Sequence, residues 1–159
     1  MSIYRPFLAI AGLVMLAVTT LVPFSSVSAI ETGHFAPDFS LTTYDGKPFK
    51  LSEQQGKIVV LEWFNPGCPF VKHQYTTGNM PMLQESLTKK GVVWVTVNST
   101  HPGHGDFLSP EKAQQISKDF GLKGSYLLRD ELGTVGKLYG AKTTPHMFVI
   151  DTSGKLIYQ

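Results

Sequence analysis

Cysteine is the residue that this chain most nearly lacks, because its 159 residues contain only one, Cys68. A single thiol cannot form a disulfide within the chain, and it cannot supply the paired cysteines of common structural zinc sites. A lone thiol is therefore inert, joined to another molecule, or reactive.

The chain also lacks a large excess of charge. It carries 14 basic and 12 acidic residues, a formal net charge of +2, and it has no internal repeat or low-complexity tract. Proteins that bind nucleic acid or anionic membranes usually show a basic patch or tail. We therefore expect no nucleic-acid partner, and instead a small molecule or another protein.

One long apolar run does occur, at the N-terminus. Arg5 precedes an almost unbroken apolar stretch over residues 7–24, and Val27-Ser28-Ala29 offers small residues at a cleavage position. This order predicts a secretory signal peptide over residues 1–29 and an exported, periplasmic domain over 30–159. A run of this length also suits an uncleaved membrane anchor, since spanning a bilayer takes roughly 17–25 residues. After cleavage, no membrane contact is expected.

Residues 30–159 alternate strand-like and helix-like segments, which predicts an α/β domain with a central mixed sheet flanked by helices. Segments 36–41 and 47–51 flank a turn-forming Asp-Gly pair and indicate an N-terminal hairpin. The apolar runs 58–64 and 92–97 predict strands covered on both faces. Residues 82–90 are expected to resume a helix broken by Gly78 and Pro81. The sequence stops after a strand, so we expect the domain to lack its final helix.

Cys68 follows the first of these buried strands through a Pro66-Gly67 turn, and Pro69 suits the first position of a helix. The N-terminus of a helix favours a thiolate, and Lys72 and His73 add positive charge nearby. We therefore expect Cys68 to be reactive. The alternative is a buried structural thiol, which free cysteine often is.

Four features of the sequence occur together: Ala36-Pro-Asp-Phe-Ser-Leu41, Gly56-Lys57, Cys68 and Thr144-Pro145-His-Met-Phe-Val-Ile-Asp151. With them the chain resembles the thioredoxin-fold redoxins, specifically the peroxiredoxin-like branch of the alkyl hydroperoxide reductase and thiol-specific antioxidant (AhpC/TSA) family. This resemblance implies a thioredoxin-like fold in which a cis-proline, Pro145, faces Cys68. Thr144, Pro145 and His146 are then the expected substrate-binding residues.

The chain lacks residues that two groups of these relatives use for catalysis, the peroxiredoxins and the Cys-x-x-Cys oxidoreductases. The threonine or serine that peroxiredoxins place three residues before the cysteine is Asn65 here, and their active-site arginine is missing near Pro145. The second cysteine of a Cys-x-x-Cys pair is Val71, so Cys68 cannot release a mixed disulfide internally. Copper chaperones of this fold have a second cysteine where Lys72 stands. No metal or cofactor is expected.

Three further side chains are candidate catalytic groups beside Cys68. Glu62 lies in a run expected to be buried, where a carboxylate is costly unless it is paired. It either takes up or delivers a proton beside the thiol, or points to the strand's edge and meets solvent or a lysine. Asn65 either donates a hydrogen bond toward Cys68 or a bound peroxide, partly replacing the family's hydroxyl, or shapes the turn with Pro66-Gly67. His73 approaches the site from the helix, as His146 does from the proline loop, and each is either a catalyst or an ordinary hydrogen-bonded histidine.

Two functions from different classes follow. The leading one is an exported, antioxidant thiol oxidoreductase in which the Cys68 thiolate attacks a hydroperoxide or a disulfide and is recycled by an external thiol or a thioredoxin-type reductant. The other is a non-catalytic binding or assembly module that uses the groove beside the cis-proline.

Overall fold

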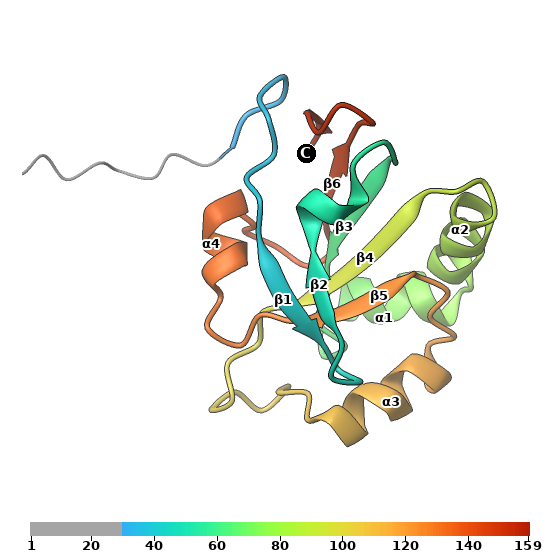
Figure 1. Ribbon diagram of the computed structural model, residues 1–159. Helices are drawn as coiled ribbons and strands as arrows, with labels where there is room; N and C mark the ends of the chain where they lie inside the picture. Colours follow the sequence, from blue (N-terminus) through green and yellow to red (C-terminus); the bar gives the residue numbers. More distant parts are fainter. Residues whose placement is uncertain (1–29) are drawn as a thin grey trace, which may run out of the picture.

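A seven-stranded sheet forms the centre of the computed structural model, which describes residues 30–159 (Figure 1). Its spatial order is β2-β1-β5-β4-β3-β6-β7. The strands are β1 (Ser40–Thr43), β2 (Pro48–Lys50), β3 (Val59–Trp63), β4 (Val93–Asn98), β5 (Tyr126–Arg129), β6 (His146–Ile150) and β7 (Leu156–Tyr158). Strands β3, β4 and β5 are parallel, and the other pairs are antiparallel. The prediction of a mixed sheet is confirmed, whereas the predicted signal peptide lies outside the described residues.

The helices lie on both faces of this sheet. They are the 3₁₀ helix η1 (Leu51–Gln54), α1 (Pro69–Thr76), α2 (Asn79–Thr88), α3 (Pro110–Asp119) and α4 (Thr134–Tyr139). Apolar residues of α1, α2 and α3 pack in one core cluster, while those of α4 pack in the other. Within residues 30–159, none of the helices has the length and apolar character needed to span a bilayer.

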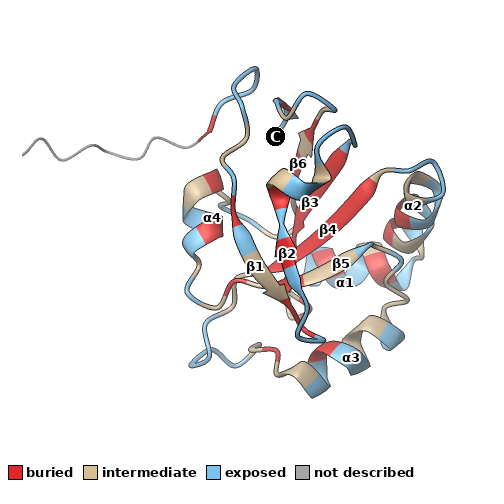
Figure 2. Cartoon of the chain, viewed as in Figure 1, coloured by how far each residue is buried: buried red, intermediate tan, exposed pale blue. Residues whose placement is uncertain are grey.

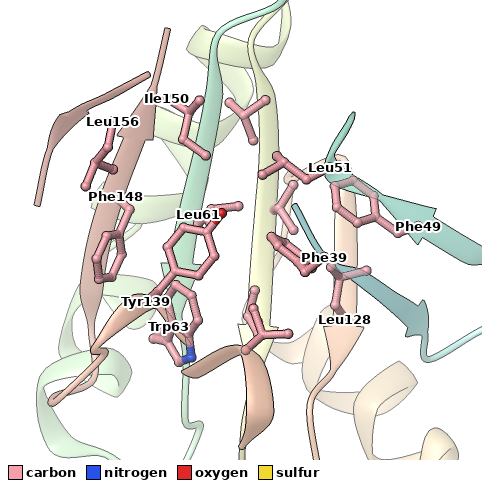
Figure 3. Close-up of a cluster of buried hydrophobic side chains, with 14 of the residues drawn as sticks. Phe39, Phe49, Leu51, Leu61, Trp63, Leu128, Tyr139, Phe148, Ile150 and Leu156 are labelled. Atoms are coloured by element: carbon pink, nitrogen blue, oxygen red, sulfur yellow. The ribbon is translucent and has the colours of Figure 1, made fainter. Parts of the chain in front are cut away.

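Strand β3 is buried along its whole length, as is its parallel neighbour β4 (Figure 2). Successive side chains of a strand point to opposite faces. Leu61 and Trp63 therefore enter the cluster that contains α4, where Trp63 packs 5.1 Å from Phe148 and 5.7 Å from Tyr139 between ring centroids (Figure 3). Core contacts on both faces fix the end of β3 that leads to Cys68.

The opposite face carries an aromatic cluster beneath α1. The Phe64 ring meets Tyr75 of α1 edge-on at 5.4 Å, and Tyr75 stacks on Phe120 at 5.4 Å. Val71 of α1 is fully buried in the same cluster. These contacts anchor the helix that begins directly after Cys68.

The predicted N-terminal hairpin is confirmed as β1 and β2, which are paired from Ser40 and Lys50 inward. The predicted start of the next helix at residue 82 is wrong, because α2 already begins at Asn79. Pro81 is accepted in the first turn, where a backbone N–H has no partner within the helix. Gly78, in the left-handed region at φ 79°, makes the sharp change of direction between α1 and α2.

Candidate active site

Cys68 is the N-cap residue of α1, and Pro69 occupies the first turn, as the sequence predicts. Its N–H donates to the Asn65 carbonyl at 3.1 Å, and its own carbonyl accepts from the Lys72 N–H at 2.9 Å. The residue is half-buried, so solvent or a substrate can reach it. The thiol thus stands at the positive end of the helix.

The loop before β6 faces this thiol. Cys68 Sγ lies 3.0 Å from the Thr144 carbonyl oxygen, to which the thiol donates a hydrogen bond. The Thr144–Pro145 peptide bond is cis. The expectation that Pro145 is a cis-proline in the loop opposite Cys68 is therefore confirmed, while the substrate-binding roles of Thr144 and Pro145 stay predictions.

The pKa of the Cys68 thiol is lowered by its surroundings. Partial burial acts to raise it, but hydrogen bonds from the Thr144 side chain and from the backbone N–H groups of Val71 and Phe70 outweigh that effect by stabilising the thiolate. The sequence pointed to the positive charge of Lys72 as well, yet the groups that lower the pKa come from the first turn of α1 and from the proline loop.

The hydrogen bonds of Asn65 are those expected of a residue that shapes the turn before Cys68. Its Oδ1 accepts from the Gly67 N–H at 2.7 Å, and its Nδ2 donates to Asp106 Oδ2 at 3.4 Å. Asp106 lies so close that a Cβ added to Gly67 would sit 2.1 Å from its Oδ2. A side chain at position 67 would therefore displace the Asp106 carboxylate from its place beside Asn65. A catalytic role for Asn65 stays a prediction.

Glu62 is fully buried on the same face of the sheet as α1. Its carboxylate accepts hydrogen bonds from Tyr75 Oη at 2.8 Å, Trp94 Nε1 at 2.8 Å, Gln84 Nε2 at 3.1 Å and the Thr96 hydroxyl at 3.4 Å. Burial raises its pKa, and these donors offset part of that effect. Glu62 is thus paired with four donors rather than with Cys68, and its part in proton transfer stays a prediction.

The two candidate histidines lie apart. His73 is exposed on α1. The His146 ring packs on Phe148 at a tilt of 42° with 4.5 Å between centroids, and its Nδ1 accepts from the Lys142 N–H at 3.3 Å. Burial and the nearby Lys142 charge lower the pKa of His146, so the neutral ring is favoured. Their catalytic and substrate-binding roles stay predictions.

The sequence model of the AhpC/TSA family matches residues 32–159, almost all of the described chain. The chain belongs to the AhpC/TSA family. The resemblance drawn from Cys68, Pro145 and the flanking motifs is thereby confirmed.

Individual relatives agree with this assignment. The thiol-disulfide oxidoreductase ResA of Geobacillus thermodenitrificans is 30% identical over 136 residues, covering 84% of this chain and 71% of the relative. Among solved structures, a conserved protein of Geobacillus kaustophilus matches at a TM-score of 0.73 and 30% identity, over 80% of this chain and 67% of that one. The exposed lipoprotein thioredoxin of Streptococcus pneumoniae matches at 0.57 and 28% identity, over 77% and 87% of the two chains. The fold is thioredoxin-like.

This AhpC/TSA member differs at the position that would complete a cysteine pair. Val71 occupies it and is fully buried beneath the first turn of α1. Between residues 30 and 159, no group of three or more His, Cys, Asp or Glu side chains is arranged to hold a metal ion. Any thiol chemistry at this site therefore rests on Cys68 alone.

Replacing Thr144 tests why the pKa of the Cys68 thiol is lowered. Thr144→Val removes the hydroxyl donor and should raise the pKa of Cys68, because the thiolate loses a hydrogen bond while the burial remains. Thiolate absorbance at 240 nm, followed against pH, measures the midpoint. Thr143→Val is the matched control, since that hydroxyl bonds to the Pro145 carbonyl instead. Equal midpoints in the two variants would contradict the assignment.

Proposed function

We propose that this protein is an exported one-cysteine thiol oxidoreductase with antioxidant, peroxiredoxin-like chemistry. The observation that carries the proposal is the half-buried thiol of Cys68 at the start of α1, 3.0 Å from the Thr144 carbonyl and with a lowered pKa. A thiolate is the nucleophile in both disulfide and peroxide chemistry. Cys68 is thus the residue that reacts.

With a disulfide R–S–S–R, the Cys68 thiolate forms a new S–S bond, the R–S–S–R bond breaks, and R–S⁻ leaves. An external thiolate then attacks the mixed disulfide and restores the Cys68 thiolate. With a hydroperoxide, an S–O bond forms as the O–O bond breaks, which leaves a sulfenic acid and an alcohol or water. One external thiol converts the sulfenic acid to a mixed disulfide with loss of water, and a second thiol restores Cys68.

Disulfides are the better-supported oxidant. The Asn65 side chain already bonds to Gly67 and Asp106, so it is not oriented to hold a peroxide in place of the usual threonine or serine. The name of the ResA relative, a thiol-disulfide oxidoreductase, points the same way. We therefore expect disulfide exchange to be the faster reaction.

Stopped-flow kinetics test the proposal. The purified protein is mixed with hydroxyethyl disulfide or with hydrogen peroxide, and loss of the free thiol is followed at neutral pH. Cys68 should react with the disulfide faster than free cysteine does, because more of it is thiolate at that pH. Reaction no faster than free cysteine with either oxidant would overturn the proposal.

Export is supported by the apolar run and small-residue site of residues 1–29 and by the exposed lipoprotein among the relatives. The mass of the protein isolated from the cell that produces it tests this point. A chain that begins at Ile30 is expected. A full-length soluble chain in the cytoplasm would contradict export.

One observation favours the alternative of a binding module. Phe70, two residues after Cys68, presents a 74% exposed apolar ring close to the thiol. A protein partner that covers Phe70 would explain its exposure without any turnover at the thiol. The kinetic test above separates the two functions, since a binding module predicts an unreactive thiol.

A further inference from the structure

A groove of about 400 Å³ is lined by two residues that contact Cys68, although Cys68 itself is not part of its lining. One wall is Thr144, whose carbonyl contacts Cys68 Sγ, and another is Asn65, whose carbonyl accepts the Cys68 N–H. Two loops complete it, one over residues 99–104 and the other over 141–144. This volume is of the size that holds a small molecule rather than a protein surface.

The two histidines of the first loop are held in the same way. His101 Nδ1 accepts from the Gly103 N–H at 3.0 Å, and His104 Nδ1 accepts from the Asp106 N–H at 3.1 Å. A nitrogen that accepts a backbone N–H carries no proton, so each neutral ring has its proton on Nε2. Both imidazoles line the groove, and Nε2–H is the group each has left to donate.

Among the residues that line the groove, the one full charge is positive. Lys142 is exposed on the opposite loop and supplies an ammonium group. Two carboxylates lie nearby, but neither is among the lining residues. Asp106 faces Asn65 and Gly67, with one oxygen 3.9 Å from His104 Nδ1, and Asp130 is buried beneath the groove, where it accepts from Ser99 Oγ at 2.6 Å.

We propose that this groove is a subsite for the carboxylates of a low-molecular-weight thiol or disulfide that reacts with Cys68. His101, His104 and Lys142 donate to the carboxylates while the sulfur of the substrate lies against the Cys68 thiolate. Charge-assisted hydrogen bonds to carboxylates are stronger than neutral ones, which makes the groove selective for charge. This inference rests on the proposed function and specifies its substrate class.

The reaction remains that of the proposed function. The Cys68 thiolate attacks one sulfur of the carboxylated disulfide, a mixed disulfide forms, and a carboxylated thiolate leaves. The half of the substrate that stays attached keeps its carboxylates in the groove. A different external thiol, as thiolate, then attacks the substrate sulfur of the mixed disulfide, leaves with it as an unsymmetrical disulfide, and frees the Cys68 thiolate.

Three disulfides of different charge test the subsite. Second-order rate constants for thiol loss are measured with oxidised glutathione, which carries carboxylates, with neutral hydroxyethyl disulfide, and with dicationic cystamine. The wild-type protein should react fastest with oxidised glutathione, relative to free cysteine treated in the same way. This preference should shrink in 1 M salt, where the Debye length falls to about 3 Å.

Lys142→Ala should slow the reaction with oxidised glutathione by about fivefold, the upper range for one exposed ion pair, and leave hydroxyethyl disulfide unaffected. His101→Asn combined with His104→Asn keeps an acceptor for the Gly103 and Asp106 N–H groups but removes both Nε2–H donors, so it should act in the same direction. Lys90→Ala is the matched control, because Lys90 is exposed just before β4, at the end of the parallel strands β3 and β4 opposite to Cys68. It should change none of the three rates.

The outcomes separate the two proposals. If hydroxyethyl disulfide itself fails to react faster than with free cysteine, the proposed function fails. If it reacts but the three disulfides show no charge preference, the carboxylate subsite is overturned and the oxidoreductase stands. If Lys142→Ala slows all three disulfides equally, the loop only positions the thiol, which also overturns the subsite.

Discussion

Cys68→Ser is expected to abolish both disulfide exchange and peroxide consumption while the fold persists. The chain has no second cysteine to take over, and a serine hydroxyl is not ionised at neutral pH. Serine is also a frequent helix N-cap residue, so it suits the start of α1. The expected result is loss of activity to the uncatalysed rate, with an unchanged far-UV circular dichroism spectrum.

A chemical control accompanies this variant. Blocking the wild-type thiol with iodoacetamide should give the same loss of activity, because it removes the same nucleophile without a change of sequence. Activity that survives in both preparations would place the chemistry away from Cys68. An unfolded Cys68→Ser protein with an active alkylated wild type would point to a structural thiol instead.

The features that the sequence predicted correctly depend on neighbouring residues. The start of α1 follows from Pro66-Gly67 and Pro69 on either side of Cys68, and these signals act within one turn of helix. Strand β3 follows from a continuous apolar run, and the hairpin from its Asp-Gly turn. The position of Pro145 opposite Cys68 was predicted from the family resemblance alone. No local pattern shows that a loop 76 residues later meets the thiol.

The features that the sequence missed depend on contacts between distant segments. Asp106 lies 41 residues from Asn65, and nothing in the 99–108 loop indicates that its carboxylate packs on Gly67. For His146, the alternation of β6 matters: it pairs with Trp63 and shares the sheet face of Phe148. The alternation of side chains along a strand could have shown on which face His146 lies. Trp63 and Glu62 must point to opposite faces, and His146, as the partner of Trp63, lies on the face away from Glu62.

Glu62 is the site of the second large expected effect. Glu62→Ala should lower the free energy of unfolding by about 4 kcal/mol, because it leaves three strong donors, on Tyr75, Gln84 and Trp94, buried without their acceptor. Urea unfolding, followed by tryptophan fluorescence, measures this change in the free energy of unfolding. Glu62→Gln is the matched variant, since it keeps the volume and one acceptor oxygen, and it should cost about half as much. Equal, small losses in both would contradict a structural role for the carboxylate.

The same pair of proteins tests the ionisation of Glu62 through pH. Burial raises the pKa of Glu62 above its ordinary value of 4.5 in the folded state, so the folded protein holds a proton that the unfolded chain has released. The free energy of unfolding of the wild type should therefore fall, relative to that of Glu62→Gln, as the pH rises from 4.5 through the folded pKa. The stability contribution is fully present below pH 4.5 and is lost above the folded pKa. A difference between the two proteins that stays constant over this range would mean that the hydrogen bonds from Trp94, Tyr75 and Gln84 balance the burial. Glu62 would then remain ionised, and it would have no proton to exchange with the Cys68 thiol near neutral pH.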